Sequence, residues 1–389
     1  MIKIDIVTTT RAEYGLMRPL IRRMSEDADI AVKLLVTGTH LSDKFGYTFA
    51  EIEKDGFCET EKIPILSDKS GTEFVSETMA NAIVAFTGYL SKARPDFILV
   101  DGDRYETLGV CIAAANCNVP IIHCGGGETT EGAVDECFRH AITKMSYLHF
   151  SATEVYRNRI IQMGENPERV FTVGSMGIEN ILHTNFLTKD ELEKHLGFSL
   201  KKTFAVATFH PVTLENNTSE QQLNELLAAC EAYPEMQFIF TKANADNGGN
   251  EINILLEKYA QTHSNTICVS SLGAIRYLSA LKYAEFVIGN SSSGITEAPS
   301  MLLPTINIGD RQRGRIQAES IINCEPQKEK ILEAIEKALS PDFKAFCRTV
   351  KNPNGDGNTT RKIIQIVKDF QKKKVVDLKK KFYDIKFIC

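Results

Sequence analysis

The sequence predicts an α/β fold with two doubly wound parallel sheets. The chain has 389 residues, too many for one ordinary hydrophobic core, so about two domains are expected. Short apolar runs alternate with helix-period segments, which predicts parallel strands joined by helices, and this rhythm pauses near Gly174 before it restarts. We therefore expect an N-terminal Rossmann-like domain over residues 1–180, a second over 181–359, and a C-terminal helix with a basic tail over 360–389.

Each expected strand is a short apolar run bounded by polar or small residues. In the first half these runs are Ile2–Val7, Ala31–Val36, Phe97–Val100, Pro120–His123 and Tyr147–Phe150. In the second half they are Thr203–Phe209, Gln237–Thr241, Thr266–Val269, Phe286–Ile288 and Thr305–Ile308. Helical patterns such as Leu16–Met24 and Thr72–Leu90 lie between them.

The last helical pattern, Thr360–Gln371, places its apolar residues on one face, so it could cap a domain or cross back onto the first. Beyond it, the lysine runs Lys372–Lys374 and Lys379–Lys381 are typical of a solvated tail rather than a binding patch.

Composition excludes several classes of function. The net charge is −5, which favours no nucleic-acid partner. The ten cysteines form no C-x-x-C pair and no zinc-type cluster, so we expect a reduced, cytoplasmic setting without a metal. Neither a signal peptide nor an apolar run long enough to span a bilayer is apparent, so no membrane partner is expected.

The most informative stretch is the serine-rich turn that follows the strand at Phe286–Ile288. After Gly289 come Ser291, Ser292, Ser293 and a second glycine, and then the expected start of a helix. Free backbone N–H groups and small hydroxyl residues suit a phosphate, and Glu297 could accept bonds from a ribose. An ordinary N-capped helix is the alternative interpretation.

Polar clusters also follow the first-half strands, where parallel sheets bind ligands. Arg11 and His40, both candidate UDP-sugar contacts by their position, follow the first two strands, and Asp101-Gly102-Asp103-Arg104 follows the third. Arg11 could clamp a phosphate or be a surface arginine at a helix entry. Asp103 and Arg104 could bind ligand or pair with each other in a structural turn.

The next strand ends in His123, followed by Cys124, three glycines and Glu128. His123, Glu128, Glu131 and Asp135 are candidate proton-transfer groups. His123 could instead be a satisfied structural histidine, and Asp135 could instead stabilise the first turn of a helix.

Second-half strands end in further candidates: His210 to donate to a diphosphate, Asn244 near the sugar or nucleotide, and Arg313 for a phosphate or the domain interface. The chain has no GxxxxGK[ST] motif and no GxGxxG motif opening the first helix, which argues against a kinase or a nicotinamide enzyme.

Taken together, these residues resemble the hydrolysing UDP-N-acetylglucosamine 2-epimerases of bacterial sialic acid and legionaminic acid synthesis. The matching stretches run in family order from residue 2 to about 370: Arg11–Gly15, Gly102–Arg104, Gly126–Glu128, Arg139–Lys144, His210-Pro211, Gly289–Gly294 and Asn307–Gln312. The terminal Phe382–Ile385 is also similar to the tail of some members.

The resemblance implies a GT-B fold with an interdomain cleft, no metal or redox cofactor, and a homodimer or homotetramer. UDP would bind mainly to the second domain, at His210, Ser291–Ser293 and Glu297, with Arg11 reaching across from the first domain and Arg313 assisting. UDP would be eliminated as the sugar loses its carbon-2 proton, and water would add to the glycal, giving N-acetylmannosamine and UDP. Asp103 and Asp135, with His123 nearby, match the family's acidic positions best.

One departure from the family concerns the base. The family usually carries glutamate or histidine two residues after His123, where this chain has Gly125. Glu128 could substitute, the base could lie elsewhere, or the protein could be an inactive UDP-sugar-binding paralogue.

Three enzyme classes compete with this interpretation. They are a sister enzyme acting on UDP-2,4-diacetamido-2,4,6-trideoxyglucose, a non-hydrolysing 2-epimerase, and a GT-B glycosyltransferase. Fold alone does not separate them.

Overall fold

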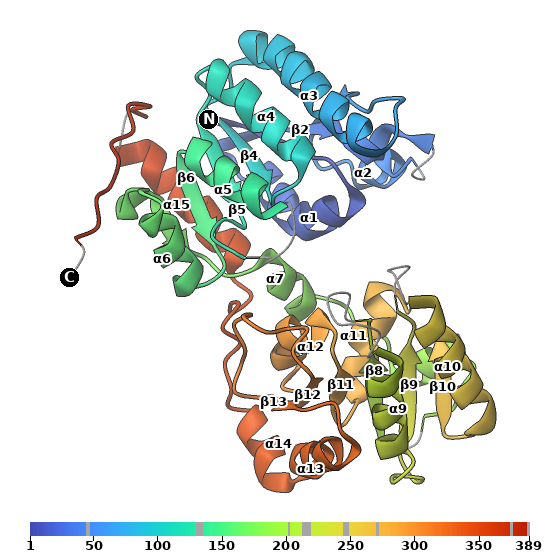
Figure 1. Ribbon diagram of the computed structural model, residues 1–389. Coiled ribbons are helices and arrows are strands. Elements are labelled where there is room, and N and C mark those ends of the chain that lie inside the picture. The colour runs from blue at the N-terminus through green and yellow to red at the C-terminus, as the bar shows by residue number, and fades with distance from the viewer. Residues whose placement is uncertain are drawn as a thin grey trace. The chain divides into compact units, whose positions relative to one another are not determined.

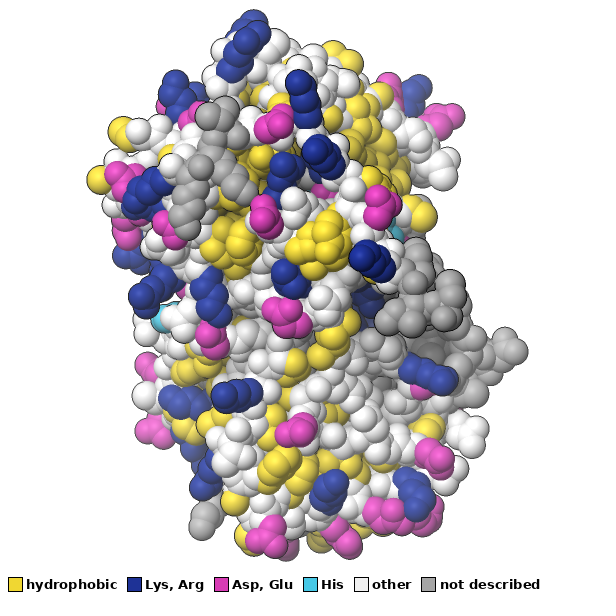
Figure 2. Space-filling model, turned by 90° about the vertical axis from the view of Figure 1, so that its left-hand side faces the viewer, with side chains coloured by type: hydrophobic (Ala, Val, Ile, Leu, Met, Phe, Trp, Pro, Cys, Tyr) yellow, Lys and Arg dark blue, Asp and Glu magenta, His cyan; other side chains and the backbone are white. Residues whose placement is uncertain are grey.

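The computed structural model describes residues 1–43, 47–129, 135–200, 203–211, 219–243, 249–269, 272–373 and 376–386. The chain forms two compact units (Figure 1): Met1–Asn180 with Asn354–Cys389, and Ile181–Pro353. No helix in the described ranges is long and apolar enough to cross a membrane. On the face drawn in Figure 2, acidic and basic side chains are interspersed rather than gathered into a patch of one sign.

The first unit is built on a seven-stranded parallel sheet with strand order β3-β2-β1-β4-β5-β6-β7. Its strands are β1 (Ile2–Thr8), β2 (Ile30–Thr37), β3 (Glu59–Ile63), β4 (Phe97–Asp101), β5 (Ile121–Cys124), β6 (Leu148–Ser151) and β7 (Val170–Thr172). The order reverses between β1 and β4, which is the topological switch point of a doubly wound sheet.

Both faces of this sheet are apolar, and successive residues of a strand enter different cores, as the two-residue strand period requires. Phe97 and Leu99 of β4 join the core beneath α1 (Arg11–Ser25) and α15 (Thr359–Lys373). Ile98 and Val100 join the core beneath α3 (Gly71–Ala93) and α4 (Tyr105–Asn116).

The remaining helices of this unit are shorter and connect the strands. They are η1 (Gly38–Leu41), α2 (Phe49–Asp55), α5 (Asp135–Met145), α6 (Glu154–Gln162) and η3 (Pro167–Arg169). The boundary between the units falls within α7 (Met176–Leu182).

Helix α15 belongs to the first unit. Buried Glu179 accepts hydrogen bonds from the backbone N–H and the hydroxyl of Thr360, both at 2.6 Å, and so caps the start of the helix. The return to the first unit begins at Asn354, earlier than the expected residue 360, because the Asn354 carbonyl already accepts a bond from the Ser175 backbone at 2.7 Å.

The basic tail after α15 is not uniformly solvated, contrary to the sequence-based prediction. Lys379 and Lys381 are exposed, but the Lys380 ammonium donates to the carbonyls of Lys144 and Ser146 and lies 2.7 Å from buried Glu165. One lysine of the run is therefore a structural group of the first unit.

The second unit contains a six-stranded parallel sheet with strand order β10-β9-β8-β11-β12-β13. Its strands are β8 (Phe204–Thr208), β9 (Gln237–Thr241), β10 (Thr266–Val269), β11 (Val287–Gly289), β12 (Thr305–Ile308) and β13 (Ile321–Cys324).

Its helices are α8 (Lys189–Leu196), α9 (Ser219–Cys230), α10 (Gly249–Thr262), α11 (Gly273–Tyr283), α12 (Ser292–Thr296), η4 (Ala298–Met301), α13 (Lys328–Leu339) and α14 (Pro341–Cys347). A core rich in phenylalanine, including Phe209, Phe238, Phe240 and Phe286, holds α9, α10 and α13 against this sheet.

Candidate active site

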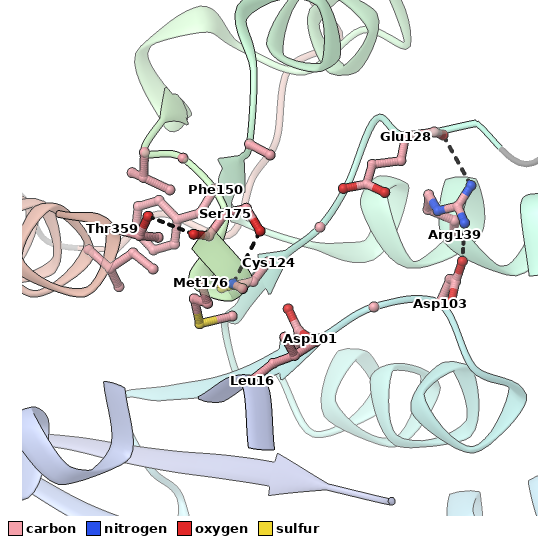
Figure 3. A pocket seen from close by; sticks show the side chains of 17 residues that line it. Leu16, Asp101, Asp103, Cys124, Glu128, Arg139, Phe150, Ser175, Met176 and Thr359 are labelled. Carbon is pink, nitrogen blue, oxygen red and sulfur yellow. Dashed lines mark hydrogen bonds and ion pairs between the residues drawn. The ribbon is translucent and has the colours of Figure 1, made fainter. Parts of the chain in front are cut away.

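A cavity of about 220 Å³ lies within the first unit, at the carboxyl ends of its strands (Figure 3). Asp101 and Cys124 end β4 and β5, while Ala152 and Val173 follow β6 and β7 directly. Neighbouring parallel strands thus deliver their last residues to one place, as expected for ligand sites in open α/β sheets.

The cavity has two chemically different walls. One carries the carboxylates of Asp101, Asp103 and Glu128. The other is mainly apolar, with side chains from elements far apart in the sequence (Leu16, Phe150, Val173, Met176 and Ile363), and it also carries the hydroxyls of Ser175 and Thr359. A ligand with both hydrogen-bond donors and apolar groups such as methyls would match such a lining.

Asp103 is held in an ion pair with Arg139 of α5. The Arg139 guanidinium is almost fully buried and also donates to Glu136 at 2.7 Å and to the Glu128 carbonyl at 3.1 Å. Arg104, the partner considered from sequence, instead forms a two-pronged pair with buried Glu106, its Nη2 atom at 2.7 Å. The Asp103–Arg104 turn network is therefore absent from the described residues, and Arg139 positions the acid.

Asp101 differs from Asp103 because no hydrogen bond or ion pair reaches its carboxylate from the described residues. Burial raises the pKa of Asp101 well above its usual range, and the negative charges of Glu13, Glu128 and Asp103 add to the effect. Sequence reasoning noted Asp101 in its strand-end cluster but did not select it as a catalytic group. Its position as the last residue of a strand could have indicated it.

Glu128 also lines the cavity, and in Figure 3 its carboxylate points into the same space as that of Asp101. The chain reaches it through Gly125, Gly126 and Gly127. Gly127 has φ +79°, and a Cβ there would collide with the Tyr156 carbonyl, so only glycine lets this loop pack against α6.

His123 does not face the cavity. It is fully buried, its Nε2–H donates to the Gly102 carbonyl at 2.9 Å, and its Nδ1 lies 3.3 Å from the Thr143 hydroxyl. Burial lowers the pKa of His123 to about 3, so the ring is neutral near neutral pH. These contacts favour the structural interpretation, in which His123 fixes the loop that carries Asp103.

His40 has a similar environment. Its ring nitrogens lie 3.0 Å and 2.7 Å from the hydroxyls of Thr8 and Thr48, and burial lowers its pKa to about 4. His40 therefore joins the ends of β1 and β2 to the start of α2.

The other candidates of the first unit are more peripheral. Asp135 is the first residue of α5, half-buried and outside the cavity lining, and Glu131 lies outside the described residues. Arg11 is the first residue of α1, is 70 % exposed, and pairs with Glu51 at 3.0 Å.

In the second unit, the serine-rich turn sits between β11 and α12. Gly289 has φ +132°, and a Cβ there would clash with the Thr208 carbonyl of the neighbouring strand, so the close approach of β11 to β8 requires glycine. Ser291 caps α12, accepting from the Ser293 backbone at 3.4 Å, and the Ser293 hydroxyl donates to Glu297. Burial raises the pKa of Glu297, partly offset by this bond.

Asn290 joins this turn to His210. The side chain of fully buried Asn290 accepts from the His210 backbone at 2.7 Å and donates to its carbonyl at 2.8 Å. Arg311 and Gln312 donate to the Asn290 carbonyl at 3.0 and 2.9 Å. The structure thus brings His210 and the serines together at the carboxyl ends of β8 and β11.

The remaining second-unit candidates are less closely tied to this turn. Ser292 is half-buried within α12, and Arg313 is exposed, with its backbone N–H bonded to the Asp310 carbonyl. Asn244 lies outside the described residues.

Two parallel-sheet units with polar turns at their strand ends define the GT-B class of α/β proteins, and comparison with solved structures agrees. The UDP-GlcNAc 2-epimerase of Neisseria meningitidis, solved bound to UDP-GlcNAc, shares this fold with a TM-score of 0.77 at 17% identity, over 95% of this chain and 100% of that one.

Sequence comparison identifies the family. The model described as UDP-N-acetylglucosamine 2-epimerase matches residues 22–368. A GDP/UDP-N,N'-diacetylbacillosamine 2-epimerase (hydrolyzing) of Campylobacter jejuni is 42% identical over 88% of both chains. Polysialic acid biosynthesis protein P7 of Escherichia coli is 39% identical over 99% of this chain and 98% of its own. The chain belongs to the UDP-N-acetylglucosamine 2-epimerase family, and it is an enzyme, a hydrolysing UDP-sugar 2-epimerase.

Proposed function

We propose that the enzyme acts on a UDP-linked 2,4-diacetamido-2,4,6-trideoxyglucose, releasing UDP and the free 2-epimeric sugar. The observation that carries this choice is the apolar wall of the cavity, formed by Leu16, Phe150, Val173, Met176 and Ile363. A sugar with a methyl group at carbon 5 and an acetamido methyl at carbon 4 would bury apolar surface there. The relative at 42% identity, which is named for diacetylbacillosamine, supports the same choice.

UDP-N-acetylglucosamine is the second candidate substrate, with N-acetylmannosamine and UDP as products for sialic acid-type synthesis. A solved structure with this fold contains UDP-GlcNAc, which favours it. Its hydroxyls at carbons 4 and 6 would need polar partners, because an unpaired polar group loses its hydrogen bonds to water on burial.

In the proposed reaction the first-unit cavity handles the sugar ring. Loss of the carbon-2 proton accompanies departure of UDP from carbon 1, and water then adds to the resulting glycal. The transition state has oxocarbenium character, so the carboxylates of Asp103 and Glu128 would stabilise its positive charge. The ion pair with Arg139 holds Asp103 in place. Asp135 remains a further candidate from the resemblance, and Glu131 remains one as a nearby carboxylate in the sequence.

In the second unit, the turn at Ser291–Ser293 would bind the diphosphate together with His210, and Glu297 would accept from the ribose hydroxyls. The hydroxyl of Ser293 already donates to Glu297, so the turn is organised for polar contacts. Arg11 and Arg313 are proposed as additional UDP-sugar contacts on the resemblance. His40, Arg104 and Asn244 are proposed because they follow strand ends in the sequence.

A product assay tests the substrate. The purified protein is incubated with each UDP-sugar, without metal or acceptor, and proton and phosphorus NMR follow the sugar and the nucleotide. We expect free UDP and the manno-configured sugar from the diacetamido substrate, with turnover at least tenfold faster than from UDP-N-acetylglucosamine. The reverse preference would establish the second candidate. UDP binding without turnover of either would support an inactive paralogue, and transfer only after adding an acceptor would indicate a glycosyltransferase.

The nucleotide site is tested separately by calorimetry with UDP. Ser293→Ala should weaken UDP binding roughly tenfold, which is about 1.4 kcal/mol, through loss of a hydrogen bond. Ser340→Ala is the control, because Ser340 is a serine of the same unit that caps α14 and lies outside the serine-rich turn. Equal UDP affinity of the wild-type protein and Ser293→Ala would leave the serine turn as an ordinary helix cap.

A further inference from the structure

The cavity acids of the first unit differ in their partners. Asp103 forms an ion pair with Arg139. The same guanidinium donates a hydrogen bond to the backbone carbonyl of Glu128. Asp101 ends β4, lines the same cavity, and receives no hydrogen bond or ion pair from the part of the chain that the structure describes. A half-buried carboxylate without a partner costs stability, so its presence calls for a functional explanation.

The geometry around Asp101 shows what space its carboxylate occupies. β4 and β5 pair in register, with Asp101 opposite Cys124, the residue before Gly125. A Cβ built on Gly125 would lie 3.9 Å from Asp101 Oδ1. The carboxylate of Asp101 therefore borders the position from which any side chain at residue 125 would start.

Glycines keep this space open. Gly125 and Gly102 have φ of +83° and +75°, respectively, and neither contributes a side chain. The nearest groups to a Cβ on Gly125 are the backbone of Gly102 and the Asp101 carboxylate itself. In Figure 3, Asp101 points from the end of its strand into the space that Glu128 also faces.

We propose that Asp101 is the catalytic base that removes the carbon-2 proton, in place of the side chain that is missing at Gly125. This assignment rests on the proposed elimination and hydration. It replaces His123, which is buried away from the cavity, and it leaves to Asp103 the stabilisation of charge.

In this step the carbon-2–hydrogen bond breaks and its proton goes to the Asp101 carboxylate, while the electron pair forms the carbon-1–carbon-2 double bond. The bond between carbon 1 and the diphosphate oxygen breaks, and its pair leaves with UDP. Water then supplies hydroxyl to carbon 1 and solvent supplies the proton to the opposite face of carbon 2, giving the epimeric sugar.

The electrostatic surroundings suit a base. Asp101 is faced by Glu13 from α1, by Asp103 from its own loop, by Glu128 from the loop after β5, and by the Cys124 thiol. Burial and the negative charges of the three carboxylates raise the pKa of Asp101, which brings its carboxylate closer to the basicity that proton abstraction near neutral pH requires.

The test compares Asp101→Asn with the wild-type enzyme on whichever UDP-sugar the wild type converts. Asparagine keeps the shape and removes the base, so we expect kcat to fall by roughly a thousandfold. UDP affinity by calorimetry should stay within about twofold. Asp101→Glu should retain part of the activity, with a larger isotope effect on substrate deuterated at carbon 2.

Chemical rescue separates catalysis from a structural role. Formate should restore part of the turnover of Asp101→Ala, whose missing carboxylate leaves room for it, but not that of Asp101→Asn, where the amide fills the same space. The acid limb of the kcat–pH profile should also be lost in the rescued variant.

Asp101→Asn activity within about fivefold of wild type, or no formate rescue of a folded Asp101→Ala, would overturn the assignment while leaving the proposed function intact. Failure of the wild type to convert either UDP-sugar would overturn the proposed function and this assignment together.

Discussion

Two carboxylates of the first unit, Asp101 and Glu165, contrast sharply in their surroundings. Asp101 is the last residue of β4 and has no partner among the described residues. Glu165 precedes β7, is 1 % exposed, and lies 3.1 Å from His149, 2.6 Å from Lys144 and 2.7 Å from Lys380.

The pKa values of the two acids move in opposite directions. Burial alone would raise both, and it does raise that of Asp101. At Glu165, the hydrogen bond from His149 and the two ammonium groups outweigh burial and lower the pKa to about 2. Charged partners thus make Glu165 a structural acid, and their absence leaves Asp101 available for proton transfer.

The largest expected effect comes from breaking the structural acid. Glu165→Gln leaves Lys144 and Lys380 without their counter-charge and should lower the free energy of unfolding by about 4 kcal/mol. Denaturant unfolding at pH 7 measures this, with Glu154→Gln, an exposed acid on α6, as the control expected to change little. Similar losses of stability in Glu165→Gln and Glu154→Gln would show that Glu165 is not a special structural acid.

The pH dependence of Glu165 follows from its lowered pKa. Its contribution to stability is present above the unfolded-state value of about 4.3 and is lost as pH falls toward about 2. The stability difference between wild type and Glu165→Gln, measured by denaturant unfolding, should therefore shrink between about pH 5 and pH 2.

Removing the partner of Asp103 should make that acid resemble Asp101. Arg139→Met leaves Asp103 without its ion-pair partner, removes one partner of Glu136, and should cost about 3 kcal/mol at pH 7. Arg22→Met, which breaks an exposed pair with Glu26, should change stability by less than about 0.5 kcal/mol. Thermal unfolding of both variants at pH 7 measures the two losses, and equal losses would show that the buried ion pair adds no more to stability than the exposed one.

A smaller loss is expected at the tail. Lys380→Met removes the donor to the Lys144 and Ser146 carbonyls and should cost about 1.5 kcal/mol. Lys379 is an exposed neighbour, so Lys379→Met should leave the free energy of unfolding unchanged. Equal free energies of unfolding for the two variants, measured with denaturant, would support the solvated-tail interpretation.

The smallest effect is a gain. Asp101→Asn removes an unpaired charge and should stabilise the protein by about 1 kcal/mol at pH 8, while reducing activity. The folded-state pKa of Asp101 is raised, so its contribution to wild-type stability is fully present below the unfolded-state pKa of about 3.9 and declines as pH rises. The stability advantage of Asp101→Asn over wild type should therefore vanish near about pH 4. A variant less stable than wild type at pH 8 would show that Asp101 has a structural role.

The strands that the sequence patterns predicted are mostly interior, and those that they missed lie at sheet edges. β3 (Glu59–Ile63), β7 and β13 pair on one side only. β3 is largely polar and solvent-accessible, so it lacks the apolar run that marks a buried strand. For the same reason, the interior strands at Gln237–Thr241 and Thr305–Ile308 match their predicted bounds.

Those parts of the candidate site whose polar residues directly follow a strand could be predicted from the sequence. Asp103, Glu128 and the serine turn all follow apolar runs, so their neighbourhoods could be inferred from parallel topology. The pairing of Asp103 with Arg139 rather than Arg104, and the burial of His123, depend on how α5 packs across the sheet, which local sequence does not specify.

The sequence by itself determined the α/β class, the parallel strand rhythm and the family, because apolar periodicity and ordered motifs are local properties of the chain. Only the tertiary structure decided which carboxylates are paired and which are not. Asp101 and Glu165 are both acids near strands in sequence. The pKa of Asp101 is raised chiefly by burial, whereas that of Glu165 is lowered despite burial by His149 and by ammonium groups from distant segments, Lys380 among them. Electrostatic interactions depend on distance in space and on burial, and neither can be read from spacing along the chain.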